Sequence, residues 1–138
     1  MQTFLPDPSF HYCATTLDGK RLNKQRIECI QIMNAFDGGG WSNHPAVLMW
    51  RPYRPAFITY WEAIEQECRD RGYKAMKVPN KNSDFLLPPW IGDDRLHSSH
   101  RLNLLYKDSD HYTQWFTEKV PTMKPDYFWP TQHKEYND

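Results

Sequence analysis

The sequence has no excess of either charge, because its 17 basic side chains are matched by 17 acidic ones. A chain without net charge has no overall field that draws it toward nucleic acid or an anionic membrane, so any anionic partner must be held by a local patch. The sequence also lacks an apolar stretch of membrane-spanning length and a secretory leader. We therefore expect a cytoplasmic protein that is neither exported nor embedded in a membrane.

Cysteine is scarce, and its spacing excludes two common kinds of small protein. Cys13, Cys29 and Cys68 are odd in number and far apart, without the paired spacing of zinc ligands or of a disulfide framework. They predict free thiols in a reducing compartment. A phosphate-binding loop is missing too, because the DGGG of residues 37–40 follows a predicted helix and lacks the Lys-Ser/Thr pair that holds phosphate and magnesium. We expect no cofactor.

Helical periodicity runs through most of the chain, whereas no alternating strand pattern persists. Capping residues, glycines and prolines place the predicted helices at about 18–36, 45–50, 55–71 and 93–106. The predicted fold class is therefore all-α, with about three to four main helices.

The segments between these helices are rich in proline. Prolines predict an irregular segment over residues 1–15, and residues 73–92 have the composition of a long loop. A tail with many prolines and aromatic residues begins at about 117. The length suits one core, so we expect a single domain over residues 1–138.

The first predicted helix, LDGKRLNKQRIECIQIMNAF, carries a carboxylate in its middle. At about 100° per residue, Glu28 shares a face with Arg21, Lys24 and Gln25. We therefore expect Glu28 on a polar, basic face, where a salt bridge to Arg21 or Lys24 is its simplest role. Four cations in this half of the helix form a local patch for an anion: Lys20, Arg21, Lys24 and Arg26.

Three histidines raise the alternative of a metal site. His97 and His100 lie one turn apart on a predicted helix, so their side chains can converge, and His44 would supply a third ligand from elsewhere. This set predicts a metal-dependent hydrolase, although it matches no known zinc spacing. Phosphate contacts, or a hydrogen-bonded structural pair, are the other roles open to these residues.

The chain start offers a different kind of reactive group. Gln2 is a large residue, which normally prevents removal of the initiator methionine, so the α-amine of Met1 is expected in the mature chain. An α-amino group has an ordinary pKa of about 8, well below that of lysine, so part of it is neutral and nucleophilic at physiological pH. Beside Glu28 it would form an amine and carboxylate pair suited to Schiff-base chemistry at a sugar carbon.

Several motifs in order give the chain a family resemblance. They are the start MQTFLP, the helix LDGKRLNKQRIEC, NHPAVLMW, a long helix closing in RDRGY, and HSSHRLNLL. Together, over residues 1 to about 116, they resemble the pyrimidine-dimer DNA glycosylases, the family of the T-even phage ultraviolet endonuclease. The resemblance implies a compact all-α fold in which the N-terminal segment threads between helices and delivers its α-amine to the active site.

The resemblance also implies a reaction and its residues. The α-amine attacks C1′ of a damaged nucleotide, the base leaves, and β-elimination then nicks the strand at the abasic site. The catalytic groups implied are the Met1 amine and Glu28. The residues expected to approach DNA are Gln2, Arg21, Lys24, Gln25, His44, His100 and Arg101. The expected partner is duplex DNA with damaged or modified bases, bound by a monomer without a metal ion.

The sequence differs from the phage enzyme at residue 2 and in net charge, and each difference leads to an expectation. There the amine is exposed by removal of methionine before a small residue, whereas Gln2 retains Met1 here. Zero net charge predicts weaker nonspecific DNA binding with a strong salt dependence. Aromatic residues that could stack on bases or wedge them apart are Trp90, Tyr112, Trp115 and the YFW of 127–129. A DNA-binding domain without catalysis stays an alternative, beside the metal-dependent hydrolase.

Overall fold

The computed structural model describes residues 1–81 and 86–137 and is helical, with no strand in that part of the chain. The all-α prediction is confirmed. The elements are α1 (Phe10–Thr16), α2 (Gly19–Ala35), α3 (Pro45–Leu48), η1 (Arg51–Tyr53), α4 (Arg54–Asp70), α5 (Asp94–Lys107), α6 (Ser109–Tyr112), η2 (Pro130–Gln132) and η3 (Lys134–Tyr136).

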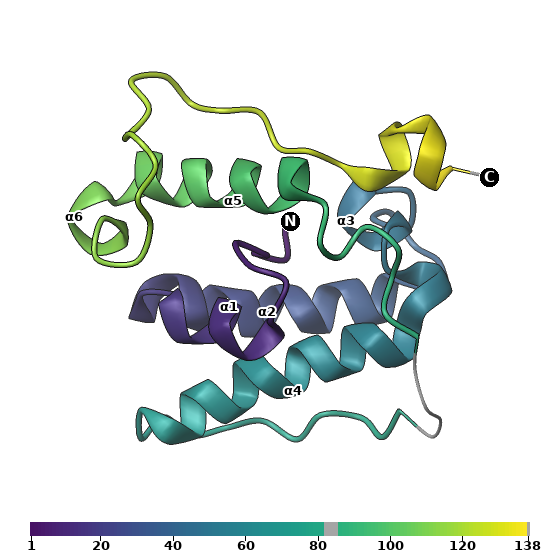
Figure 1. Cartoon of the computed structure of the whole chain (residues 1–138). Helices are drawn as coiled ribbons and strands as arrows, with labels where there is room; N and C mark the ends of the chain where they lie inside the picture. Colours follow the sequence, from purple (N-terminus) through teal and green to yellow (C-terminus); the bar gives the residue numbers. More distant parts are fainter. Residues whose placement is uncertain (82–85, 138) are drawn as a thin grey trace.

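The helices form a compact body around the start of the chain. Helices α1 and α2 both pack on α4, and α5 lies across from them (Figure 1). The N-terminus lies between α5 and the layer of α1 and α2, and the C-terminal tail runs back along α5 toward α3 (Figure 1). The threaded N-terminal segment expected from the resemblance is therefore present.

Helix α1 was not predicted, because residues 1–15 were expected to be irregular. Both prolines of this region precede the helix, where a proline costs no intrahelical hydrogen bond. Ser9 caps the helix, since its side chain accepts a hydrogen bond of 3.2 Å from the Tyr12 N–H. Cys13 and Ala14 then face the core.

The other predicted helices have the expected places. Helix α2 ends before the DGGG turn, and α4 and α5 begin and end within one or two residues of their predicted bounds. His44 is the N-cap of α3, since its ring accepts from the Ala46 N–H at 3.0 Å. The predicted loop 73–92 contains no helix where it is described, and its residues 82–85 lie outside the described part.

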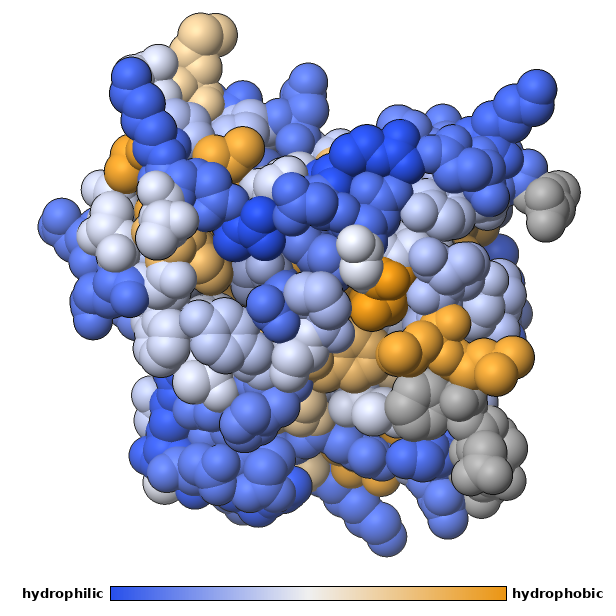
Figure 2. Space-filling view, in the orientation of Figure 1, coloured by the Kyte–Doolittle hydropathy of each residue, from blue (hydrophilic) through white to orange (hydrophobic). Residues whose placement is uncertain are grey.

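The core is aromatic and aliphatic, and it encloses all three cysteines as free thiols, as expected. The face shown in Figure 2 is mostly hydrophilic, with separate apolar spots rather than one continuous apolar patch. Within residues 1–81 and 86–137, no helix has both the length and the apolar character that a membrane span needs.

The environment of Glu28 differs from the one predicted. The buried face of α2 includes Leu22, Gln25, Glu28 and Ile32, so the acid does not lie on a solvated basic face. The reason is tertiary: the N-terminal segment covers the polar side of α2 that the helical periodicity assigns to solvent. Gln25 and Glu28 are buried beneath it.

Arg26 also leaves the predicted cationic patch. Its Nε lies 3.2 Å from each oxygen of Glu65, and its Nη2 donates to the Lys74 carbonyl. Glu65 is fully buried on α4 and also accepts from Trp61 Nε1 and the Met76 N–H, at 3.2 and 2.7 Å. This network ties α2 to α4 and to the segment that follows α4.

We expect Arg26→Ala to destabilise the protein by about 3 kcal/mol, because it leaves the buried Glu65 carboxylate without its cation. Chemical denaturation measures the loss. The matched control is Arg69→Ala, which removes an exposed arginine that donates to Gln66 and should stay within about 0.5 kcal/mol of the parent. Equal effects of the two changes would contradict this account of the Glu65 network.

Candidate active site

Residues 2–6 have no regular secondary structure, and side chains of neighbouring helices supply hydrogen bonds to their backbone. The Phe4 N–H donates to Gln25 Oε1, and Gln25 Nε2 donates to the Gln2 carbonyl, each at 2.8 Å. The Tyr60 hydroxyl of α4 donates to the Phe4 carbonyl, also at 2.8 Å. One amide side chain therefore binds both a donor and an acceptor of the segment and fixes it to α2.

Helix α5 holds the next residues from the other side. The Leu5 N–H donates to His100 Nδ1 at 3.0 Å, and His97 Nδ1 lies 2.8 Å from the Leu5 carbonyl. Arg101 Nη1 donates to the Pro6 carbonyl at 2.9 Å. Buried backbone groups need such partners, so these side chains specify one path for the segment.

The segment places the Met1 amine beside Glu28. The amine nitrogen lies 3.8 Å from Glu28 Oε1, and only 3% of the Met1 side chain and 9% of the Glu28 side chain are exposed. Met1 itself packs against the core. An amine and a carboxylate from distant parts of the chain thus share one site, in which Met1 is partly buried and Glu28 is buried.

Two polar groups beside this pair have no hydrogen-bond partner among the described residues. They are Glu28 Oε2 and the Gln2 side-chain amide Nε2, both buried. Buried polar groups are normally satisfied, and leaving one unpaired disfavours folding. Unpaired groups that flank a potential nucleophile are available to a bound ligand.

Charges gather around Glu28. Burial raises the pKa of the Glu28 carboxyl, while the nearby N-terminal ammonium, Lys24 and Lys107 act in the opposite direction. Burial also lowers the pKa of Lys107. Three neighbouring cations, Arg21, Lys24 and Lys124, lower it further. We call these four side chains the cationic rim: Arg21, Lys24, Lys107 and Lys124. The rim provides the local positive field that the neutral chain lacks overall.

The C-terminal tail closes one side of the site. The Lys107 ammonium donates to the Tyr127 hydroxyl at 2.9 Å and also lies over the Tyr127 and Phe4 rings. Burial and the Glu28 charge raise the pKa of Tyr127 to about 12, so the phenol stays protonated at neutral pH. Tyr127 therefore bonds as a neutral hydroxyl beside the carboxylate.

Comparison with known proteins identifies the family of the chain. A sequence model described as pyrimidine dimer DNA glycosylase matches residues 1–78, more than half of the 138 residues. The chain belongs to this family. It is a DNA glycosylase by family, and DNA is its substrate. Searches of curated proteins and of solved structures each found no match.

The matched range of the glycosylase family contains the amine, the carboxylate and part of the segment's anchoring. Met1, Glu28, Gln25 and Tyr60 lie within residues 1–78, whereas α5 and the tail lie beyond it. The family match therefore covers the reactive pair, and the described structure adds the groups that enclose it from α5 and the tail.

The structure gathers some of the residues predicted to approach DNA and separates others. Gln2 adjoins the amine, Lys24 acts on the charge of Glu28, and His44 feels the N-terminal charge. Arg21 lies near Lys107 and pairs with Asp18 at 3.2 Å. Gln25 and His100 are fully buried and bond to the N-terminal segment, so they hold that segment instead of facing DNA. Arg101 pairs with Asp94 and Glu118, which occupies its guanidinium.

Two aromatic residues predicted as wedges belong to the core. Trp90 and Tyr112 are buried, Trp90 against Trp50 and Tyr112 against Phe116. Trp115 packs edge-on against Tyr12. Large aromatic side chains usually fill cores, and here tertiary packing takes Trp90 and Tyr112 out of reach of DNA, whereas Trp115 is only partly buried.

The three histidines do not gather as a metal site. Both ring nitrogens of His97 are engaged, Nδ1 with Leu5 and Nε2 with the Gly92 N–H at 2.8 Å, and His100 Nδ1 accepts from Leu5. Within the described residues, no group of three or more His, Cys, Asp or Glu side chains is placed to hold a metal ion. His97 and His100 instead both bond to the Leu5 backbone, which is the structural role that the sequence analysis left as an alternative.

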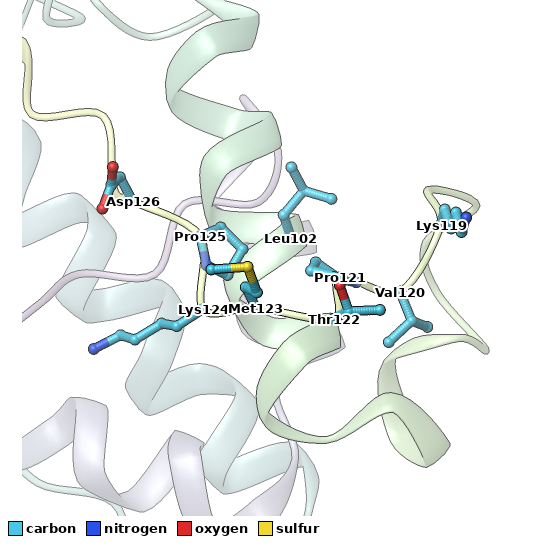
Figure 3. Close-up of a pocket in the computed structure, with 9 residues that line it drawn as sticks. All are labelled: Leu102, Lys119, Val120, Pro121, Thr122, Met123, Lys124, Pro125 and Asp126. Carbon is cyan, nitrogen blue, oxygen red and sulfur yellow. The ribbon is translucent and has the colours of Figure 1, made fainter.

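A pocket of about 580 Å³ lies beside the site, between α5 and the tail. Leu102 of α5 and residues 119–126 line it (Figure 3), and the lining side chains are mainly aliphatic. Lys124 extends away from the other lining residues (Figure 3), and its charge acts on Lys107 instead. Neither Met1 nor Glu28 lines this pocket, so the reactive pair lies outside it.

Sequence reasoning missed Lys107, Lys124 and Trp50. The indole Nε1 of Trp50 donates to Thr3 Oγ1 at 2.9 Å and helps to fix the N-terminal segment. Lys107 ends α5, and Lys124 lies in the tail, far in sequence from Glu28. No local pattern marks these residues, because their relation to Glu28 is set by the packing of α5.

His100 makes the stability of the fold depend on pH. Burial, with His97 and Lys107 nearby, lowers the pKa of His100 to about 3, whereas an unfolded histidine titrates near 6.5. The unfolded chain therefore binds the extra proton first. The stabilisation is complete above about pH 6.5 and is lost as pH falls toward 3, by about 1 kcal/mol per pH unit.

We expect His100→Asn to reduce this slope, because an asparagine oxygen can accept the Leu5 N–H without titrating. Denaturant unfolding at pH 7 and pH 5 gives the slope for the parent and the variant. His111→Asn is the control, since that histidine is only partly buried at the end of α6. A parent slope that His100→Asn leaves intact would show that other groups carry the pH dependence.

Proposed function

We propose that the protein is a DNA glycosylase with a coupled β-elimination lyase activity, acting on damaged or modified pyrimidines in duplex DNA. The Met1 α-amine is the nucleophile, and Glu28 is the carboxylate that assists it. The observation that carries the proposal is the 3.8 Å separation of these two groups in a buried site. The family match supports the glycosylase half of the activity.

In the first half-reaction, the neutral amine attacks C1′ of the target nucleotide. The new N–C1′ bond forms as the glycosidic bond breaks, and the base leaves with the bonding electron pair and takes up a proton. The attached nitrogen then loses a proton, its electron pair forms the C=N bond as the C1′–O4′ bond breaks, and O4′ takes up a proton, which gives a protonated imine. Positive charge develops at C1′ throughout, and the Glu28 carboxylate is placed to stabilise it.

In the second half-reaction, the imine makes the C2′ proton acidic. Removal of this proton places its electron pair between C2′ and C3′ and expels the 3′ phosphate oxygen, which nicks the strand. Water then releases the sugar fragment and restores the amine. Glu28 Oε2, which has no partner within the described residues, is the acceptor we propose for the proton.

The cationic rim and the unpaired Gln2 amide serve DNA binding in this proposal. Lys24 and Lys107 present positive charge to Glu28, and Arg21 and Lys124 lie near Lys107, which suits the phosphates on either side of a target nucleotide. A target within a duplex must leave the base stack before its C1′ can reach a buried amine, at a cost of a few kcal/mol. Phosphate contacts at the rim offset part of that cost.

Borohydride trapping tests the proposal directly. The purified protein is incubated with a duplex that holds one abasic site, and in parallel with one that holds a thymine dimer, and borohydride reduces any imine to a stable adduct. We expect an adduct on the abasic duplex, mapped by mass spectrometry to the Met1 amine, with no effect of chelator. Absence of an adduct on both duplexes, with the amine confirmed free, would overturn the lyase proposal.

We expect Glu28→Gln to lower trapping and strand cleavage by about 100-fold or more, because it removes the assisting charge and keeps the shape. Duplex affinity, measured by anisotropy, should change little. Glu62→Gln is the control, since it removes a half-exposed carboxylate on α4. Full activity of the Glu28→Gln protein would remove the carboxylate from the mechanism.

Residue 2 allows the nucleophile to be moved by one position. Gln2→Ala should permit removal of Met1, so that the new amine starts about 3.8 Å further along the chain. We expect trapping to fall about 100-fold, since a displacement of this size disrupts the reactive geometry. Gln2→Leu keeps a large residue and hence Met1, so it controls for loss of the amide. Mass spectrometry establishes which chains keep Met1, and equal trapping without it would contradict the assignment.

A further inference from the structure

A row of four aromatic rings leads from the site to an exposed indole. The aromatic row consists of Tyr127, Trp129, His44 and Trp41. Successive ring centroids lie 5.9, 5.8 and 6.0 Å apart, from Tyr127 to Trp129, His44 and Trp41. One end lies beside Glu28 through Tyr127, and His44 in the middle is close enough to feel the N-terminal charge. The other end, Trp41, is 60% exposed.

Trp41 is exposed but not loosely held. The Ser42 N–H donates to the Gly39 carbonyl at 3.2 Å, and the His44 N–H donates to the Trp41 carbonyl at 3.0 Å. Arg51 also donates to the Ser42 carbonyl. Gly38 and Gly39 adopt positive φ angles of 132° and 102°, which turn the chain sharply before the indole. The turn thus presents a large flat ring in a fixed place.

One side of the indole borders open space. Trp41 lines a hollow of about 250 Å³ at the C-terminal end of α2, together with Gln31 and Asn34. Positions 38–40 face no neighbouring atoms within 4 Å, so side chains do not fill this hollow from the turn. A flat ring can therefore lie against the indole without displacing protein.

The indole and the cations lie on opposite sides of Glu28 along α2. Arg21 and Lys24 precede Glu28 in the helix, whereas Trp41 follows the C-terminal end of the helix at Ala35. A nucleic acid whose sugar reaches the Met1 amine would thus meet phosphate-binding charge on one side and an exposed aromatic ring on the other. Aromatic rings stack on bases of any sequence.

We propose that Trp41 stacks on a nucleobase next to the target nucleotide and holds the duplex open while the sugar reaches the Met1 amine. This inference rests on the proposed function, since it takes the amine as the point of reaction. His44 packs edge-on against the indole, and Trp129 packs edge-on against His44. The occupant of the hollow is a base of the bound DNA.

Two measurements separate stacking from chemistry. The first uses a duplex with one tetrahydrofuran abasic-site analogue and 2-aminopurine as its neighbour, because stacking quenches 2-aminopurine fluorescence. The second compares single-turnover cleavage of an abasic site in a duplex with cleavage of the same site in a single strand, where no stack needs to open. Both are made on the parent protein, Trp41→Ala and Trp41→Phe.

We expect 2-aminopurine fluorescence to be higher in the Trp41→Ala complex than in the parent complex. The Trp41→Ala protein should cleave the duplex about tenfold more slowly and change single-strand cleavage less than twofold. Trp41→Phe should recover most of both effects, since it keeps a stacking ring. Tyr73→Ala is the control, because this exposed aromatic lies at the other end of α2, with its hydroxyl near Gly19.

Each outcome has one meaning. Parent-like fluorescence of the Trp41→Ala complex would overturn the stacking inference, whatever the cleavage rate. Quenching that depends on Trp41 in a protein that forms no borohydride adduct would support stacking and overturn the imine chemistry instead. Trp41 is largely exposed, so loss of folding does not complicate the comparison, and thermal unfolding of each variant confirms this.

Discussion

The N-terminal segment is held by side chains, and the candidate site depends on this constraint. Residues 2–6 run between helices, so their buried amides and carbonyls need partners that α2, α4 and α5 provide through Gln25, Tyr60, His97 and His100. The partners come from three helices that are far apart in the chain, so these helices must be packed before the segment has one path. The position of the Met1 amine is a consequence of that path.

The same arrangement leaves groups unsatisfied where a substrate would bind. Glu28 Oε2 and Gln2 Nε2 have no partner within the described residues, and burial opposes the charge on Glu28. Both features disfavour folding, while the network around Glu65 and the aromatic core stabilise the body that carries them. The free energy lost at the site is offset by contacts elsewhere in the same helices.

A neutral protein can still present a strong local field. The four cations of the rim come from α2, the end of α5 and the tail, and they gather around Lys107, which together with Lys24 acts on the buried Glu28 carboxylate. Much of the remaining charge is paired, as in Arg71 with Glu67 and Arg101 with Glu118. Overall charge therefore says little about this surface, because the field depends on which cations remain near the site.

The sequence by itself determined the main helices, although not α1, and it singled out the candidate reactive groups. Caps and glycines located α2, α4 and α5, and the pairing of Met1 with Glu28 was open to inference once a family resemblance was seen. Only the tertiary structure decided that Arg26 serves Glu65, that His100 holds Leu5, and that Lys107 and Tyr127 enclose the site. Periodicity reports which face of a helix is polar, whereas the segment that covers that face is set by contacts between residues far apart in the chain.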